Sequence, residues 1–199
     1  MLFFDTMQTE FEAKFFPISK DDFRALLHNV GARLKQQETL MRRVIYQLAD
    51  KKWLRIRDEG IKTTITIKEI INPTTIDGVR EIEITTDDFH KAKQLFDTIG
   101  LAATSYQENY RETWELHGAI ITIDTWPGLD PMLEIESDSA EQVKEVIKML
   151  GLNEKDALYG AVDTLYYMKH GISVEAFNII KNIIFDTIED VLNQLKRNS

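Results

Sequence analysis

Glu10-Phe11-Glu12-Ala13-Lys14 is a stretch in which charged and apolar side chains alternate. Because residues i and i+2 of a β-strand share a face, its charged side chains point one way and its apolar side chains point the other way. The same Glu-x-Glu pattern recurs at Glu81/Glu83 and at Glu134/Glu136, each time shortly before a helical pattern. These three stretches therefore predict a sheet that carries carboxylates along one face.

The rest of the chain extends this pattern into a sheet with helices beside it. Alternation with a period of two predicts strands over residues 8–15, 40–47, 52–58, 63–70, 80–86, 108–117, 119–125 and 132–137. Helical periodicity predicts helices over residues 21–35, 87–100, 139–151, 154–169 and 173–197. Short turns between most strands favour antiparallel pairing. The predicted fold class is therefore α+β, an eight-stranded antiparallel sheet with helices packed outside.

Two interpretations of the charged strand faces stay open. In the first, an open antiparallel sheet exposes these faces to water. In the second, the sheet closes into a barrel, or tunnel, and its charged faces point toward each other. The second is favoured because solvated faces are usually rich in Thr, Ser, Lys and Gln, whereas Glu-x-Glu recurs here on three strands. The apolar faces are also bulky enough to pack under helices.

The composition is that of one globular domain. The chain has 199 residues, of which 43% are hydrophobic, so we expect a single domain over 1–199, with a core at about 8–150 and helices at about 154–197 packed on it. The sequence has no cysteine, which excludes disulfides, thiolate zinc sites and cysteine nucleophiles. A net charge of -9 argues against nucleic acids and membrane surfaces as partners. With no long apolar run and no signal-peptide pattern, we expect a cytoplasmic protein.

An enclosed interior of this kind must neutralise its carboxylates. Two carboxylates about 4 Å apart repel by about 4 kcal/mol at an effective dielectric constant of about 20. Mg²⁺ or Mn²⁺, which prefer carboxylate and water ligands, would relieve this repulsion. Basic side chains on the same faces can grip a phosphate chain: Lys14, Arg55, Arg57, Lys68 and Arg111. Together the two sets indicate metal-assisted phosphoryl or nucleotidyl chemistry.

At these residues the chain resembles the CYTH superfamily, the triphosphate tunnel metalloenzymes. This family includes class IV adenylyl cyclases, thiamine triphosphatases and inorganic triphosphatases. The stretch at residues 10–14 matches the family's E-x-E-x-K motif, and six further elements follow in the family's order: residues 53–60, 67–69, 81–83, 110–114, 123–124 and 133–136. The resemblance spans about residues 8–150 and implies an eight-stranded antiparallel tunnel with helices outside.

The resemblance also implies roles for individual residues. The acids at family positions that coordinate a divalent metal are Glu10, Glu12, Asp124, Glu134 and Glu136. The bases at positions that grip the triphosphate are Lys14, Arg55, Arg57, Lys68 and Arg111. We expect catalytic roles for Lys68 and for Glu83, which matches a tunnel acid that supports a base or a second metal. Two departures bear on substrate identity: Asn109 replaces a second base, and the second strand lacks the acid that often follows its aromatic residue.

The expected function is Mg²⁺- or Mn²⁺-dependent hydrolysis of inorganic triphosphate or of a nucleoside triphosphate. One alternative is a class IV adenylyl cyclase, which needs an adenine pocket that the sequence does not reveal. A second alternative is a noncatalytic polyphosphate- or nucleotide-binding module, against which the full set of acids argues. The last predicted helix, 173–197, is expected to cover the body, to form a homodimer contact or to plug one tunnel mouth.

Overall fold

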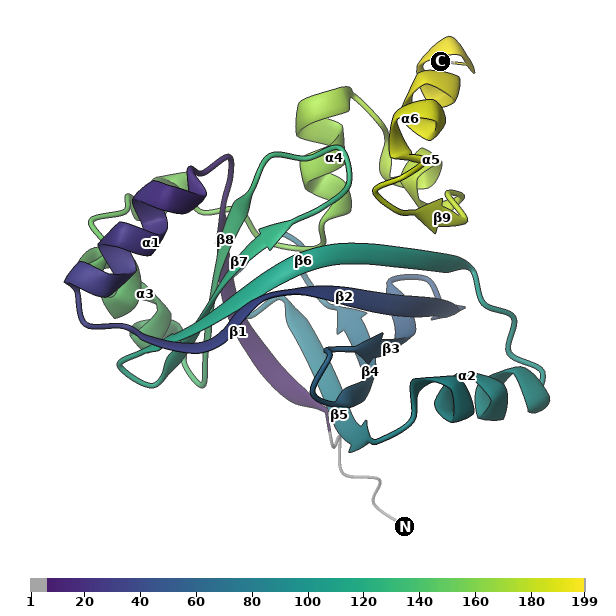
Figure 1. Cartoon of the computed structure of the whole chain (residues 1–199), viewed down its shortest axis with the longest axis horizontal. Helices are drawn as coiled ribbons and strands as arrows, with labels where there is room; N and C mark the ends of the chain where they lie inside the picture. Colours follow the sequence, from purple (N-terminus) through teal and green to yellow (C-terminus); the bar gives the residue numbers. More distant parts are fainter. Residues whose placement is uncertain (1–6, 199) are drawn as a thin grey trace.

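The strands of the computed structural model close into a barrel (Figure 1). The structure describes residues 7–198, so the first six residues of the expected domain and Ser199 lie outside it. The barrel strands are β1 (Gln8–Phe15), β2 (Arg33–Ala49), β3 (Lys52–Asp58), β4 (Thr63–Ile70), β5 (Val79–Thr86), β6 (Ser105–Leu116), β7 (Ala119–Thr125) and β8 (Met132–Ser137). Their order is β2-β3-β4-β5-β1-β8-β7-β6, with antiparallel pairing throughout, and β6 pairs back to β2. The predicted closed sheet of eight strands is confirmed, and the open sheet is wrong.

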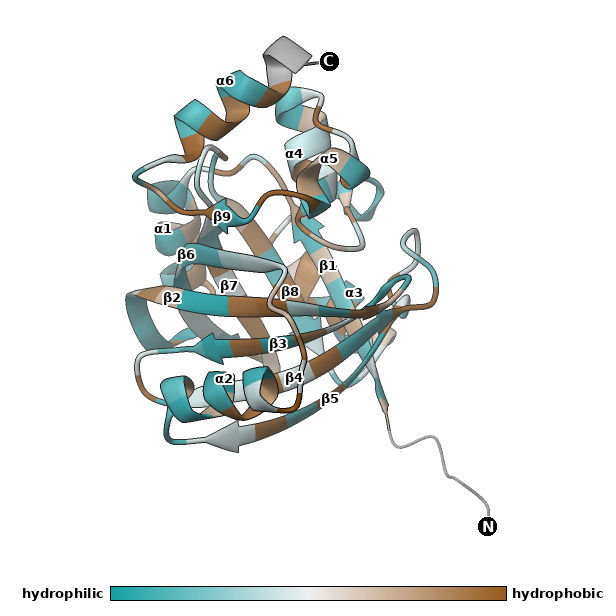
Figure 2. Ribbon diagram, turned by 90° about the vertical axis from the view of Figure 1, so that its right-hand side faces the viewer, coloured by the Kyte–Doolittle hydropathy of each residue, from teal (hydrophilic) through white to brown (hydrophobic). Residues whose placement is uncertain are grey.

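Apolar side chains on the outer face of the barrel pack under three helices. α1 (Lys20–Asn29) and α3 (Ala140–Met149) lie on the same side of the barrel, and α2 (Phe89–Thr98) lies away from them (Figures 1 and 2). Leu27 of α1 and Val143 of α3 share one core with Ile135 of β8. Ala92 of α2 packs against Leu54 of β3. Each helix begins after a side chain that caps it: Ser19, Asp88 and Ser139.

The first helix is shorter than predicted and the second strand is longer. The helix predicted over 21–35 ends at Asn29, and Gly31 then takes a left-handed conformation with φ of 79°. β2 runs over 33–49 rather than 40–47 and pairs with β3 on one side and β6 on the other. Leu34, which the periodicity placed on a helix, lies in β2 and is exposed. The long pairing of β2 with β6 is what closes the barrel.

The two predicted C-terminal helices are wrong as continuous helices, because each segment is divided into shorter elements. Residues 154–169 form a 3₁₀ turn, η1 (Glu154–Asp156), and α4 (Asp163–His170), with Gly160 in a left-handed conformation between them. Residues 173–197 form α5 (Val174–Asn178), β9 (Asn182–Ile183) and α6 (Ile188–Asn198). β9 pairs in parallel with β6 at residues 106–107, beyond the part of β6 that β7 covers. Pairing with a free strand edge therefore overrides the helical periodicity of this isoleucine-rich stretch, since β-branched side chains also suit strands.

The C-terminal elements pack against one end of the barrel. Trp126 and Met132, at the connection between β7 and β8, share a core with Tyr166 of α4, Phe177 of α5 and Leu192 of α6. Figure 2 shows these elements grouped above the strands. None of the helices within the described residues is long and apolar enough to cross a membrane.

Strand register turns the charged faces inward. Residues that pair directly across an antiparallel ladder point to the same face. The directly paired charged residues are Arg43 with Arg57, Lys68 with Glu81, Glu12 with Glu136, Lys14 with Glu134, and Arg111 with Asp124. The alternate residues Ile56 and Ile135 point outward, where both are fully buried. The interior of the barrel is therefore charged, while its outer face supplies the hydrophobic cores.

Candidate functional site

Three carboxylates from three strands meet on one side of the barrel interior. Carboxylate oxygens of Glu10 (β1), Glu81 (β5) and Glu136 (β8) all lie within 4.8 Å of one another, and we call these residues the carboxylate cluster. An all-oxygen donor set of this kind suits Mg²⁺ or Mn²⁺. The ammonium group of Lys68, from β4, lies 2.6 Å from Glu10 and 3.2 Å from Glu81. One ammonium group therefore balances part of the charge of three acids.

The protonation of the cluster reflects this crowding. Burial, together with repulsion by Glu10, raises the pKa of Glu136 to about 7. Burial acts to lower the pKa of Lys68, but the attraction of Glu10, Glu81 and Glu12 together outweighs it and the pKa is raised. The cluster thus holds more negative charge than Lys68 compensates, which is a condition that a divalent cation relieves.

Lys14 joins a second pair of carboxylates next to the cluster. Its ammonium group forms ion pairs with Glu12 and, at 3.4 Å, with Glu134, and all three residues are buried. Burial raises the pKa of Glu12 to about 7 in spite of Lys14. Burial also acts to raise the pKa of Glu134, but Lys14 and Arg111 outweigh it and lower that pKa. One carboxyl of this pair is therefore poised to take up a proton, while the other stays ionised.

Asp124 is held by neighbouring donors and is fully buried. Arg111 donates two hydrogen bonds to its carboxylate, at 2.6 and 2.8 Å, and reaches Glu134 at 3.3 Å. The side-chain amide of Asn109 donates to Asp124 at 2.9 Å. Asp124 thus orients Arg111 and Asn109, and its role as a metal ligand stays a prediction.

Guanidinium groups lie on the opposite side of the interior, on β2 and β3. Arg55 donates to the Thr66 hydroxyl at 3.1 Å and lies 3.6 Å from Glu83. Arg57 donates to Glu59 at 2.8 Å. Burial, with repulsion by Arg57, lowers the pKa of Arg55 to about 10. Closely spaced guanidinium groups of this kind form a site for a polyanion.

Arg43 is a site residue that the sequence did not single out. It faces the interior because it pairs with Arg57 of β3 and with Gln107 of β6. Burial, with repulsion by Arg57, lowers the pKa of Arg43 well below its usual range. Its neighbours on the same face of β2, Met41 and Ile45, are apolar. The alternation that revealed the other charged faces is therefore missing from β2.

Glu81 is the second site residue that the sequence did not assign. The Glu-x-Glu pattern includes both acids of β5, but the family resemblance implies a role only for Glu83. The structure places Glu81 in the carboxylate cluster, whereas Glu83 accepts a hydrogen bond from Thr66 at 2.7 Å. The register that pairs Gln8 with Glu81 decides this, and no feature of the sequence shows that register. The catalytic role expected for Glu83 stays a prediction.

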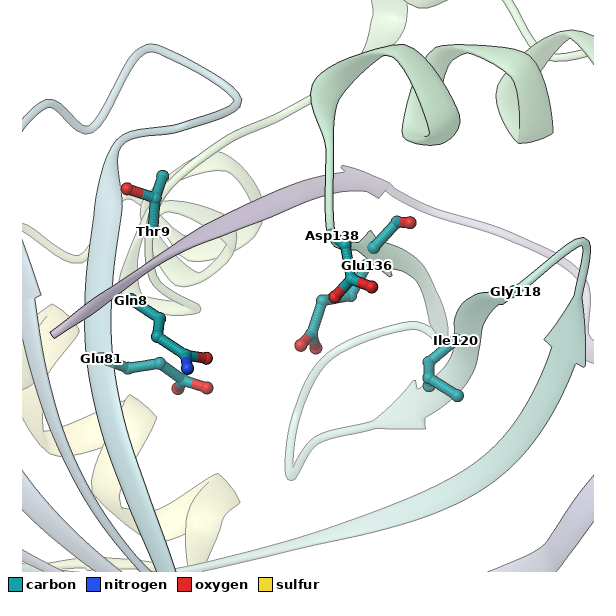
Figure 3. Close-up of a pocket in the computed structure, with 8 residues that line it drawn as sticks. Gln8, Thr9, Glu81, Gly118, Ile120, Glu136 and Asp138 are labelled. Atoms are coloured by element: carbon teal, nitrogen blue, oxygen red, sulfur yellow. The ribbon is translucent and has the colours of Figure 1, made fainter.

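A cavity of about 340 Å³ opens beside the carboxylate cluster (Figure 3). Its lining comes from β1, β5, β7 and β8 and includes Gln8, Glu81, Ile120 and Glu136. In Figure 3 the carboxyl groups of Glu81 and Glu136 extend into the same space. The carboxylate cluster is therefore reached through this mouth of the barrel.

Comparison with known proteins identifies the family. Residues 8–161 match the CYTH domain, so the chain belongs to the CYTH domain family. It is similar to a conserved hypothetical protein from Pyrococcus furiosus, with 30% identity and a TM-score of 0.63 over 75% of this chain and 94% of that one. It is also similar to a protein from Pyrococcus horikoshii OT3, with 25% identity and a TM-score of 0.63 over 74% and 93% of the two chains.

A more distant structure shares the fold. A candidate adenylate cyclase from Vibrio parahaemolyticus has 13% identity and a TM-score of 0.67, over 79% of this chain and 97% of that one. A search among proteins of curated function found no match.

Proposed function

We propose that this protein is a divalent-metal-dependent triphosphatase that hydrolyses inorganic triphosphate or a nucleoside triphosphate inside the barrel. The main support for this proposal is that acidic and basic side chains occupy opposite sides of one closed interior. Buried carboxylates on β1 and β8, with Glu81 of β5, face arginines on β2, β3 and β6. Acids that suit a hard cation and arginines that suit phosphate oxygens are the two halves of a site for a metal-bound phosphate chain.

The basic side chains bind the phosphate chain and neutralise the charge that develops on it. Glu59 and Asp124 fix the guanidinium planes of Arg57 and Arg111 through hydrogen bonds of 2.8 Å. These groups are therefore oriented before a substrate arrives, and so cost little reorganisation during the reaction. Positioning and charge stabilisation of this kind account for most catalysis of phosphoryl transfer.

The acidic side chains form the other half of the site. Glu10, Glu81 and Glu136 would hold Mg²⁺ or Mn²⁺, with Glu12 and Glu134 adjacent. A bound divalent cation would polarise phosphoryl oxygens and lower the pKa of a coordinated water. Lys68, expected from the sequence to be catalytic, holds two acids of the carboxylate cluster in place. Carboxylates that face the substrate orient the attacking water by accepting its hydrogen bonds.

Phosphate release tests this proposal. With Mg²⁺ or Mn²⁺, the wild-type protein should release phosphate from tripolyphosphate and from ATP, and EDTA should stop the release. Glu136→Gln keeps the shape of the side chain but removes its charge, so it should abolish turnover. Glu115→Gln is the matched control, because Glu115 pairs with Arg33 and Lys35 near the surface. Equal activity in Glu136→Gln and in the control would contradict the proposal.

An adenylyl cyclase is the second candidate, because a candidate adenylate cyclase shares the fold. The cavity at the carboxylate mouth is lined mainly by polar residues, which favours a phosphate chain over a nucleobase there. Cyclic AMP and pyrophosphate, measured in the same ATP incubation, would identify a cyclase. A protein that binds tripolyphosphate but forms none of these products and releases no phosphate would be a noncatalytic binding module.

A further inference from the structure

The outer face of β5 carries apolar side chains that lie beyond the reach of α2. Ile82 and Ile84 lie across from two outward isoleucines of β4 and point the same way. Those β4 residues, Ile65 and Ile67, pack against the core to which Ala92 of α2 belongs. Ile82 and Ile84, by contrast, are 39% and 61% exposed. The apolar outer face of the barrel thus continues one strand past the helix that covers it, at the lower border of the strands in Figure 2.

The same part of β5 has a free strand edge. β1 pairs with β5 only at residues 79–81, whereas β4 pairs with β5 along its other side as far as Thr86. No strand within residues 7–198 pairs with the remaining edge, residues 82–86, which we call the β5 edge. Residues 82–85 are exposed on both faces of the sheet. Because the β5 edge is rich in β-branched residues and has neither lysine nor proline, it is a template for another strand.

The β5 edge is complementary to itself in one register. If two copies pair in antiparallel fashion about Ile84, then Ile82 lies opposite Thr86 and Glu83 lies opposite Thr85. Pairing about Glu83 would instead set two carboxylates directly opposite each other, where like charges repel. The available length favours the first register, since β1 occupies β5 up to residue 81 and β5 ends at Thr86. The middle of the β5 edge is therefore Ile84.

We propose that the β5 edges of two copies of this chain pair as antiparallel strands in a symmetric dimer centred on Ile84. Such an interface is isologous, because the same patch is used by both copies. It adds main-chain hydrogen bonds and covers Ile82 and Ile84 with the isoleucines of the second copy. Residues directly opposite each other share a face, so Thr85 of the second copy lies beside Glu83 on the inner face of the barrel wall. The contact is small, and we expect a dissociation constant in the micromolar range.

Disulfide cross-linking tests the register directly. The chain has no cysteine, so Ile84→Cys introduces a single thiol per copy. Residues opposite each other in antiparallel strands have Cα atoms about 4.5–5.5 Å apart, which suits a disulfide. With oxidised glutathione as the oxidant, Ile84→Cys should form a covalent dimer.

Ile82→Cys is the matched control for Ile84→Cys, because it places a thiol on the same face of the same strand. In the proposed register the two copies of residue 82 are offset by four residues, or about 13 Å, and should not cross-link. A mixture of Ile82→Cys and Thr86→Cys proteins should form the mixed dimer, since these positions lie opposite each other. Cross-linking of Ile82→Cys as fast as that of Ile84→Cys would overturn the proposed pairing.

Sedimentation velocity tests the dimer without a covalent bond. The mass of the wild type should approach that of a dimer as its concentration rises through the micromolar range. Ile84→Lys should stay monomeric, because it sets two ammonium groups opposite each other. Ile179→Lys is the matched control, since Ile179 is 72% exposed among the C-terminal elements, and it should dimerise as the wild type does. A dimer that is lost in Ile179→Lys but kept in Ile84→Lys would overturn the proposal.

Residues 1–6, which precede β1 and lie outside the described residues, are the other candidate occupant of the β5 edge. A wild type that stays monomeric, with a variant lacking residues 2–6 that dimerises, would show that the chain's own start covers this edge. That outcome would overturn the proposal. None of these measurements depends on turnover, so the dimer and the proposed triphosphatase stand or fall separately.

Discussion

Lys68 Nζ lies 2.6 Å from a carboxylate oxygen of Glu10. An ammonium group therefore lies among the carboxylates that would hold a cation. Barrel closure produces this contact. The β4–β5 register sets Lys68 opposite Glu81, and the β1–β5 register brings Glu10 alongside. Lys68 therefore neutralises, in the metal-free protein, part of the charge that a divalent cation would neutralise more fully.

Lys68→Met should destabilise the metal-free protein by about 3–5 kcal/mol, because buried carboxylates lose their partner. Mg²⁺ should restore part of this stability, since it binds only the folded chain. Denaturant unfolding in EDTA and in Mg²⁺ measures both effects. Lys52→Met is the control, because Lys52 forms a half-exposed pair with Glu69 and should cost about 0–1 kcal/mol. Equal losses in the two variants would contradict the account.

The stability of the metal-free protein should fall as the pH rises from about 4.5 to about 7. Burial raises the pKa of Glu12 and of Glu136 from 4.5 to about 7. Between these values the unfolded chain releases protons that the folded chain keeps, so each carboxyl opposes folding by roughly 1.4 kcal/mol per unit of pKa shift. Urea unfolding in EDTA over this pH range is the measurement.

Two further features define this pH profile. The lowered pKa of Glu134 acts in the opposite sense, because the stability it contributes above about pH 4.5 is lost in more acidic solution. Glu12→Gln should flatten the decline between about pH 4.5 and 7, since it removes one of the two carboxyls. A metal-free protein that becomes more stable over that range would show that the interior acids are not crowded.

Arg57→Ala should lower kcat/KM for tripolyphosphate and for ATP by a similar factor, about 100-fold, because it removes a preorganised donor that contacts what both substrates share. Trp53→Ala should affect only the substrate that carries a base. Trp53 lies on the same face of β3 as Arg55 and Arg57, where its ring can stack on adenine. Steady-state kinetics with both substrates would contradict this assignment if Arg57→Ala impaired only one of them.

Most of the barrel could be predicted from the sequence because its strands alternate strictly and follow one another through short turns. The predicted strands 8–15, 52–58, 63–70, 119–125 and 132–137 have the same bounds in the structure. The C-terminal part could not be predicted in the same way. Ile180 and Ile184 fit a helical period, yet Ile183, which lies between them, pairs with the free edge of β6 as part of β9. Only the folded barrel creates that edge.

The candidate site, like the fold, could be predicted from the sequence only in part. Most of its residues carry a charge that alternates with apolar neighbours, as Glu10, Glu12 and Lys14 do, so the sequence alone turns them to one face. The role of Arg43 could not be predicted because its neighbours on the same face of β2, Met41 and Ile45, are apolar. The role of Glu81 could not be predicted because only strand register decides which acid of β5 lies beside Glu10. Neither register nor the packing of Trp126 over Arg43 is encoded in a local pattern.

The central claim, metal-dependent hydrolysis of a triphosphate inside the barrel, is tested most directly by a side-by-side kinetic comparison of tripolyphosphate and ATP at fixed Mg²⁺ and pH, with an EDTA-treated control. Tripolyphosphate should be hydrolysed with the higher kcat/KM, since the phosphate chain supplies most of the contacts in the transition state. The EDTA-treated protein should release no phosphate. Undiminished turnover in EDTA, or cyclic AMP and pyrophosphate as the products from ATP, would contradict the account.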